Sequence, residues 1–373
     1  MHFDNKETRM LNLFSLRFPL FMRKLSIIII LIGCFSSAHC QTFKGTVYDR
    51  STDSTLSSAI VYISGTSVGT YSDIHGKFDL DISEYSSMPI TISILGYYSV
   101  TLSEHSSNKM YDIYLSPKMN ELNEVVIKGK KGKWETYLRI FKREFLGETE
   151  TAMECNILNE KDMRFSYNSS NFGYSSDSST LRAFSSKPII IHNNDLVYTI
   201  TYYLDSFKYC RIKGENKEIT EASTIMGNYM FKDDLLTINE PEKGKVIERR
   251  KSAYLGSRMH FFRLLYGGSL SQRGRYNISL SDNSLFSKGF SIGSKMPISS
   301  DSLLIRKDRN SSYIRKERDL YVKFANKSST IIVKMDSAYF EKDGYYDPIS
   351  IEFSGEMSKQ RIADLLPFEY VLN

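Results

Sequence analysis

Residues 43–49 read Phe43-Lys44-Gly45-Thr46-Val47-Tyr48-Asp49, and apolar and polar side chains alternate along most of this stretch. Alternation with a period of two is typical of a β-strand with one buried face. Four more strand-like stretches follow at close spacing, with polar turns between them: 59–63, 77–82, 90–94 and 111–115. Short strands at this spacing predict an antiparallel β-sandwich over residues 42–117.

Three residues at the turns of this stretch are of types that favour tight bends. Gly65 follows the second predicted strand, and Asp73 and Gly76 lie in the turn before the third. Glycine adopts positive φ without steric cost, and an aspartate side chain bonds to nearby backbone amides. We therefore predict structural turn roles for Gly65, Asp73 and Gly76.

The order of these motifs resembles the carboxypeptidase-regulatory-like domain. The resemblance lies in Gly45-x-Val47-x-Asp49, Ala59-x-Val61-x-Ile63, Gly65-Thr66, Gly69-Thr70, Asp73-x-x-Gly76-x-Phe78 and Leu95-Gly96-Tyr97. It implies a transthyretin-like, seven-stranded-type antiparallel sandwich, in a family that is abundant in envelope proteins of Bacteroidetes. His75 stands where the family more often has Asp or Asn, which argues against cation binding at that turn.

The sequence lacks the common signatures of catalysis. Zinc peptidases need closely spaced His and Glu ligands, yet no histidine here is followed three residues later by glutamate. A phosphate-binding loop and a dinucleotide fingerprint are also missing from the sequence, and Phe290-Ser291-Ile292-Gly293 is interpreted as a loop and not as the Gly-x-Ser-x-Gly elbow of a hydrolase. We therefore expect no enzyme activity, no catalytic residue, no cofactor and no bound metal.

Residues 1–40 have the layout of a secretory signal peptide. Arg23-Lys24 precede an apolar run from Leu25 to Ile32, and small and polar residues follow. The run is shorter than the ~20 residues of a membrane-spanning helix, so we expect no transmembrane helix in the mature chain. Met22 stands just before the charged pair. One alternative is therefore that translation starts at Met22 and that residues 1–21 do not belong to the protein.

The signal predicts export to the periplasm, the outer membrane or the cell surface. Lipoprotein processing is the alternative, with anchoring at Cys34 in the lipobox-like sequence Leu31-Ile32-Gly33-Cys34. Half of the net charge of +6 belongs to residues 1–40, which hold five basic and two acidic side chains. The remaining charge is too small to indicate nucleic-acid binding.

A larger second region follows the predicted sandwich. The 373 residues suffice for two domains, and the high Tyr and Phe content favours β structure. Residues 118–133 end in Lys-Gly-Lys-Lys-Gly-Lys and are predicted to be a solvated linker. For residues 134–373 we predict a β-rich α+β domain, with helices at 134–146 and 248–266. The predicted fold class is therefore mainly β.

A second resemblance covers nearly the whole chain after the signal. Its motifs are Phe145-Leu146-Gly147, Cys155-x-Ile157-Leu158-Asn159, Ala253-Tyr254-x-Gly256-Ser257-x-x-His260-Phe261 and Met357-Ser358-x-Gln360-Arg361-x-Ala363-Asp364-Leu365-Leu366-Pro367. They are similar to a group of Bacteroidetes envelope proteins with this two-part layout. That resemblance implies an architecture and no mechanism.

Few residues of the second region are candidates for chemistry. His260 and Arg263 share a predicted helix and are the candidates if a site exists, although packing contacts are the commoner role of such residues. Cys155 and Cys210 follow the signal, and an oxidising compartment permits a disulfide between them. Two buried thiols are the slightly preferred alternative, since the spacing fits no metal or redox motif.

Three functions fit these features. The first is a non-catalytic binding or structural module of the cell envelope, with an envelope protein or a glycan as partner. The second is a glycan or peptide hydrolase without a known motif, with a site built from His260, Arg263 and carboxylates of the second region. The third is an auxiliary of outer-membrane nutrient uptake, suggested by the kinship of the first domain to receptor extensions.

Overall fold

The computed structural model describes residues 41–372 except 107–108, 119–130, 173–175, 215–217, 271–275, 281–295, 298–299, 307–310 and 317–318. Residues Thr42–Asn373 form one unit, separate from Met1–Gln41. The predicted signal, Cys34 and most of the predicted linker therefore lie outside the described residues. Among the described helices, none has the length and apolar character needed to cross a membrane.

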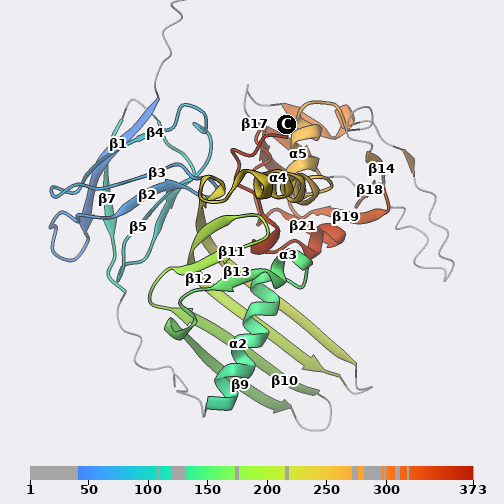
Figure 1. The fold of residues 1–373 in the computed structure, drawn as a ribbon, viewed down its shortest axis with the longest axis horizontal. Helices are drawn as coiled ribbons and strands as arrows, with labels where there is room; N and C mark the ends of the chain where they lie inside the picture. The colour runs from blue at the N-terminus through green and yellow to red at the C-terminus, as the bar shows by residue number, and fades with distance from the viewer. Residues whose placement is uncertain are drawn as a thin grey trace, which may run out of the picture. The chain divides into compact units, whose positions relative to one another are not determined.

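The predicted β-sandwich forms at the start of this unit (Figure 1). Its described residues contribute seven strands to two sheets, with orders β4-β1-β7 and β3-β2-β5-β6. The bounds are β1 (Thr42–Asp49), β2 (Ile60–Ile63), β3 (Gly69–Tyr71), β4 (Lys77–Asp81), β5 (Ile90–Ser93), β6 (Val100–Leu102) and β7 (Met110–Leu115). Alternate side chains of β1 and β4, such as Phe43 and Leu80, fill the core between the sheets.

One pairing differs from the predicted antiparallel arrangement. β1 and β7 run parallel, with Gly45 opposite Tyr111 and Val47 opposite Ile113. These two strands are the first and the last of the sandwich, so no hairpin joins them and the intervening chain supplies the long connection that parallel pairing needs. The mainly β class and the seven-stranded sandwich are confirmed, with this one parallel pair as a correction.

A long antiparallel sheet begins the second region, and helix α2 (Lys131–Leu146) lies against one face (Figure 1). In the described part the strand order is β8-β11-β12-β10-β9, and β13 also pairs with β12. The bounds are β8 (Cys155–Ile157), β9 (Met163–Phe172), β10 (Ser176–Ser185), β11 (Ile189–Asn193), β12 (Tyr198–Lys213) and β13 (Ile219–Asp233). Phe141 of α2 contacts the rings of Phe165 and Phe207, which joins helix and sheet.

The helix predicted over residues 248–266 is two helices, α4 (Glu240–Tyr254) and α5 (Arg258–Tyr266). Gly256 between them has a φ of 81°, a conformation that ends a helix. The Ser257 side chain then accepts a hydrogen bond from the backbone N–H of His260 and caps α5. The predicted end at Gly267 is confirmed, and the single helix is wrong.

Two smaller sheets and a short helix complete the described chain. The sheet orders are β15-β14-β18-β19-β21 and β16-β17-β20. The strands are β14 (Tyr276–Leu280), β15 (Met296–Pro297), β16 (Leu304–Arg306), β17 (Ser311–Arg315), β18 (Leu320–Phe324), β19 (Lys327–Val333), β20 (Ser337–Glu341) and β21 (Ile351–Gly355). Helices α3 (Glu150–Met153) and α6 (Glu356–Lys359) are short. The region is thus the β-rich α+β structure that the sequence predicts.

The sandwich contacts the second region through the turn at Gly65. The N–H of Gly65 donates to the carbonyl of Tyr229 at 2.7 Å, and the N–H of Phe231 donates to the carbonyl of Thr66 at 2.9 Å. The Phe368 N–H donates to the carbonyl of Gly65 at 2.9 Å. One predicted turn residue therefore bonds both to β13 and to the C-terminal segment.

Candidate functional site

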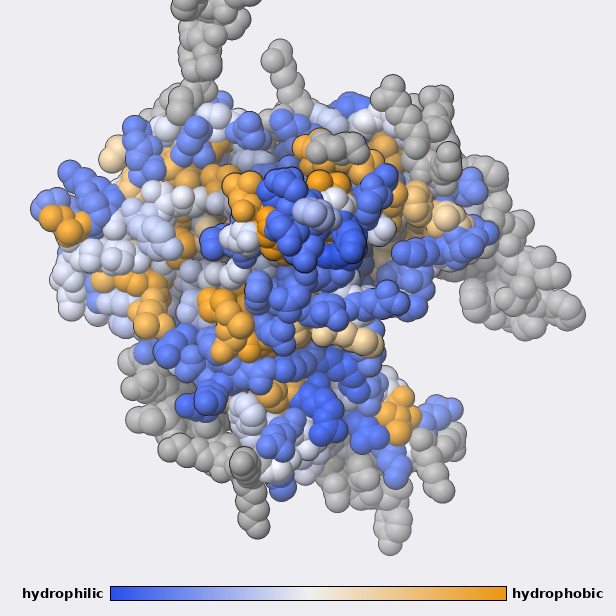
Figure 2. All heavy atoms as spheres, in the orientation of Figure 1, coloured by the Kyte–Doolittle hydropathy of each residue, from blue (hydrophilic) through white to orange (hydrophobic). Residues whose placement is uncertain are grey.

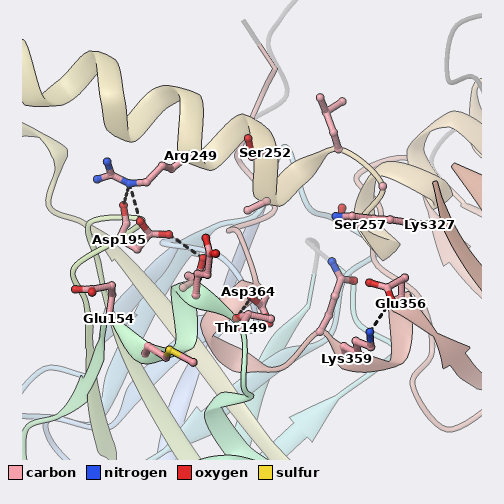
Figure 3. Close-up of a pocket in the computed structure, with 17 residues that line it drawn as sticks. Thr149, Glu154, Asp195, Arg249, Ser252, Ser257, Lys327, Glu356, Lys359 and Asp364 are labelled. Atoms are coloured by element: carbon pink, nitrogen blue, oxygen red, sulfur yellow. Dashed lines mark hydrogen bonds and ion pairs between the residues drawn. The ribbon is translucent and has the colours of Figure 1, made fainter. Parts of the chain in front are cut away.

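A polar cleft of about 740 Å³ lies where helices α3, α4, α5 and α6 come together (Figure 3). The turn between β11 and β12 and the first residue of β19 also contribute to its walls. The lining residues labelled in Figure 3 are Thr149, Glu154, Asp195, Arg249, Ser252, Ser257, Lys327, Glu356, Lys359 and Asp364. Hydroxyl, carboxylate, guanidinium and ammonium groups thus face one space, which falls in the size range of small-molecule sites.

Asp195 is held in place at one end of the cleft. Its carboxylate accepts a hydrogen bond from the Thr151 hydroxyl at 2.8 Å and forms an ion pair with Arg249 at 2.7 Å. The Arg249 guanidinium also donates to the backbone carbonyl of Asp195 at 2.8 Å. These contacts join α3, the β11–β12 turn and α4, so this wall is preorganised.

Asp364 lies deeper and has both carboxylate oxygens engaged. One accepts from the Thr149 hydroxyl at 2.6 Å and the other from the backbone N–H of Arg361 at 3.2 Å. Burial raises the pKa of Asp364, and the hydrogen bond from Thr149 opposes that effect. Because Thr149 is also the N-cap of α3, the hydrogen bond between Thr149 and Asp364 fixes the start of this helix at the cleft.

The opposite wall comes from α6 and the start of β19. Lys359 and Glu356 form an ion pair at 2.6 Å, one turn apart on α6. The Gln360 side-chain oxygen accepts the first free N–H of α5, that of Arg258, at 3.0 Å. Lys327 lies on this side of the cleft (Figure 3). In the part of the chain that the structure describes, no hydrogen bond or ion pair engages the side chains of Lys327, Ser252 or Glu154, and the charge of Lys327 acts on Glu356.

The described residues hold no group of three or more His, Cys, Asp or Glu side chains suited to a metal ion. Three of the cleft carboxylates, those of Asp195, Glu356 and Asp364, are instead engaged by hydroxyl, guanidinium, ammonium or backbone N–H partners. The chemistry that this lining supports is therefore hydrogen bonding to a polar ligand.

His260 and Arg263, the two sequence-predicted candidates, lie on α5 and are not among the lining residues. The Nδ1 atom of His260 accepts the N–H of Gly256 and contacts the Tyr276 hydroxyl, each at 3.1 Å. Burial, followed by the charge of Arg263, lowers the pKa of His260 to about 4. The buried ring is thus neutral at ordinary pH.

Arg263 is an anchor for the C-terminal segment. Its guanidinium donates to three backbone carbonyls, those of Asp343 at 2.9 Å, Phe368 at 3.0 Å and Tyr370 at 2.6 Å. His260 and Arg263 therefore lie on one helix, as predicted, and the side chains of both form hydrogen bonds that stabilise the fold.

Cys155 and Cys210 are free thiols in the structure. Cys155 lies on β8 and Cys210 on β12, and β11 pairs between them. The Cys155 thiol bonds to the carbonyl of Thr151 at 3.4 Å, and burial raises its pKa to about 12. Cys210 lies 3.7 Å from the Thr180 hydroxyl.

The predicted turn residues lie in turns of the sandwich. Gly65 and Gly76 have φ values of 79° and 74°. The Asp73 carboxylate accepts the N–H groups of His75 and Lys77, both at 2.8 Å. These bonds close the turn between β3 and β4, so the role of Asp73 is structural.

The sequence did not single out the cleft residues. In the sequence, Asp195 lies in the turn-like Asn193-Asn194-Asp195, and Arg249 lies in the basic run Arg249-Arg250-Lys251 within the helix predicted over 248–266. Their partners come from distant segments, since Thr151 is 44 positions from Asp195 and Thr149 is 215 positions from Asp364. Spacing along the chain therefore contains no signal for this site.

Comparison with known proteins gives one match to a family model and similarity to solved structures. No curated protein matches the sequence significantly. One solved structure that matches is that of a proposed carbohydrate-binding protein from Bacteroides uniformis. It shares 10% identity at a TM-score of 0.18, and the match covers 50% of this chain and 98% of that one. Residues 43–127 match the model of the CarboxypepD_reg-like domain, which confirms that the β-sandwich at the start of this chain is a domain of that family.

Proposed function

We propose that this chain is an exported, non-catalytic binding protein of the cell envelope and that its polar cleft binds a glycan. The observation that supports this most is the lining of the 740 Å³ cleft by paired carboxylates, hydroxyls and cations. Sugar hydroxyls both donate and accept hydrogen bonds, and such a lining offers partners for both roles. The space suits one or two sugar rings.

Preorganisation supports binding at this site. Thr151 and Arg249 fix Asp195, and Thr149 fixes Asp364, before any ligand arrives. Rigid polar groups lose little conformational entropy when a ligand binds, so their hydrogen bonds contribute more to affinity. Glu154, Ser252 and Lys327 then add groups whose hydrogen bonds a ligand can complete.

The positions of His260 and Arg263 favour binding over hydrolysis. A general acid or base must reach its substrate, whereas His260 is buried against Gly256 and Tyr276. Arg263 has its guanidinium bonded to carbonyls of the C-terminal segment. Neither residue lines the cleft, so the hydrolase alternative loses its two named residues.

A titration against oligosaccharide classes tests this function. The purified chain is titrated calorimetrically with neutral glucans, amino-sugar oligomers and uronic-acid oligomers, and the ligand is recovered afterwards for mass spectrometry. We expect saturable heat with at least one class and recovery of that oligosaccharide at its original length. Absence of binding to every class would contradict a glycan ligand, and recovery of shortened oligosaccharide would contradict a non-catalytic role.

A further inference from the structure

The outer edge of β13 (Ile219–Asp233) pairs with no other strand in the part of the chain that the structure describes. β12 pairs with β13 from Tyr198 to Lys213, while β11 and β10 share its other edge. β13 is thus a border strand of this sheet (Figure 1). Exposed strand edges present unpaired backbone groups that another strand can pair with.

Part of this edge is already covered by the sandwich. The Gly65 turn bonds to the outward carbonyl of Tyr229 and the outward N–H of Phe231. Backbone groups alternate in direction along a strand, so every second residue from Ile219 to Gly227 also points its N–H and carbonyl outward. Within the described residues, no backbone bond reaches the outer edge of residues 219–227.

The side chains of this uncovered stretch do not protect it. Natural edges are guarded by lysine, proline or inward-facing charges, and residues 219–227 contain neither lysine nor proline. Their one charged residue, Glu221, is neutralised by Arg143 at 3.2 Å and Arg211 at 3.4 Å. Ile219 and Met226 are 51% and 53% exposed. The edge is therefore neutral, partly apolar and open.

Another border strand of the sheet, β9, differs. β9 begins with the carbonyl of Met163 bonded to both the Trp134 indole and the Arg164 guanidinium. Arg164 also bonds to the carbonyl of Lys161 at 2.9 Å. Side chains thus occupy the start of the β9 edge, and a cation lies beside it.

On the face drawn in Figure 2, hydrophobic residues form several separate groups among hydrophilic ones. Association through a broad apolar surface would require a contiguous patch of several hundred Å². Pairing of backbone groups along a strand needs no such patch, because main-chain hydrogen bonds supply the attraction.

We propose that β13 pairs with β13 of a second copy of this chain, in antiparallel orientation about a two-fold axis at Ser223. This axis is the midpoint of residues 219–227, so the pairing uses every uncovered residue and stops before the stretch bonded to the Gly65 turn. It places Ala222 opposite Thr224 and Glu221 opposite Ile225, so no like charges face each other. In a two-fold pairing the same strand edge of both copies is covered, so no third copy can add to it and the assembly is a dimer.

This interface is independent of glycan binding, and solution mass tests it. Light scattering after gel filtration should give twice the mass of one chain for the wild type. Thr224→Lys puts two like charges near the axis and should give the monomer mass. The matched control Asn168→Lys, on exposed β9 of the same sheet, should remain a dimer. A wild-type monomer, or a dimer that Thr224→Lys leaves intact, overturns the proposal.

Crosslinking provides a second readout that does not depend on the stability of the lysine variant. In a Cys210→Ser background, Ser223→Cys should form a disulfide-linked dimer, because the two-fold axis brings both copies of this position within disulfide range. Ile219→Cys is the control, since its two copies would lie about 26 Å apart along the paired strands. Equal crosslinking at both positions, or chains longer than dimers, contradicts the two-fold register.

Discussion

At the scale of single residues, buried and half-buried arginines of α4 and α5 have structural roles. Arg250, Arg258 and Arg263 all donate to backbone carbonyls. A guanidinium can satisfy several carbonyls at once because its N–H donors point in fixed directions. Each such arginine therefore joins segments that lack regular secondary-structure bonds to each other.

Arg250 makes the densest set of these contacts. It is 5% exposed, bonds to the carbonyls of Leu196 and Val197, pairs with both oxygens of Asp233 and lies 3.8 Å from the centre of the Tyr198 ring. Arg250→Met should lower the free energy of unfolding by about 2–4 kcal/mol, because the buried Leu196 carbonyl loses its donor, the Val197 carbonyl keeps only the Asp234 N–H, and the ion pair with Asp233 is lost.

The matched control for that prediction is Arg249→Met, whose side chain is 39% exposed. It should cost only about 1 kcal/mol, since water can replace its contacts. Denaturant unfolding of both variants measures the difference, and equal losses would show that Arg250 has no special structural role.

His260 makes stability depend on pH. Its folded pKa of about 4 lies below the unfolded value of 6.5. Between these values the unfolded chain binds a proton that the folded chain does not, so stability falls as pH drops from 6.5 to 4. The loss should reach about 3 kcal/mol at most.

His260→Asn tests this dependence. The asparagine oxygen can accept the Gly256 N–H but does not titrate, so the variant should lose less stability than the wild type over that range. Urea unfolding at several pH values provides the comparison. Parallel pH curves for both proteins would contradict a buried neutral histidine.

At the scale of elements, the sequence predicts the sandwich well because its strands alternate and its turns carry glycine and aspartate. It also predicts the end of α2 and that of α5. It misses the break at Gly256, because the apolar spacing continues through it from Tyr254 to Phe261. β13 was missed as well, since its small polar residues owe their strand conformation to pairing with β12.

Gly256 should be sensitive to substitution for a definite structural reason. Its φ is +81°, and an added Cβ would lie 2.9 Å from the Phe324 ring. Gly256→Ala should therefore destabilise the chain by about 1–3 kcal/mol. Gly244→Ala, in the middle of α4 with no neighbour within 4 Å, should stabilise it by up to about 1 kcal/mol. Thermal unfolding compares the two, and the same sign for both would contradict the helix break.

At the scale of the whole unit Thr42–Asn373, the cleft could not be predicted because it is made by tertiary contacts. Thr149, Asp195 and Asp364 meet only when the C-terminal segment folds back against α3 and the β11–β12 turn. The sandwich takes part in the same arrangement, because the Gly65 turn bonds to Phe368 of that segment.

Gly65 tests this coupling against a matched glycine. An added Cβ at Gly65 would lie 2.5 Å from the Phe368 ring, whereas Gly96 has no neighbour within 4 Å, and both have positive φ. Gly65→Ala should therefore lose more stability than Gly96→Ala and should separate the unfolding of the sandwich from that of the rest. Calorimetry would show two transitions for Gly65→Ala and one for Gly96→Ala. A single transition with equal loss in both would contradict the coupling.

The measurement that tests the central claim most directly compares oligosaccharide binding by two double variants. Glu154→Gln with Lys327→Met changes two charged cleft side chains that form no hydrogen bond or ion pair in the described structure. Glu135→Gln with Lys323→Met changes exposed residues outside the cleft, with Lys323 on the strand that precedes β19. Calorimetric titration should show binding weakened about tenfold or more by the cleft pair and unchanged by the control pair. Equal affinity in both would contradict the cleft as the binding site.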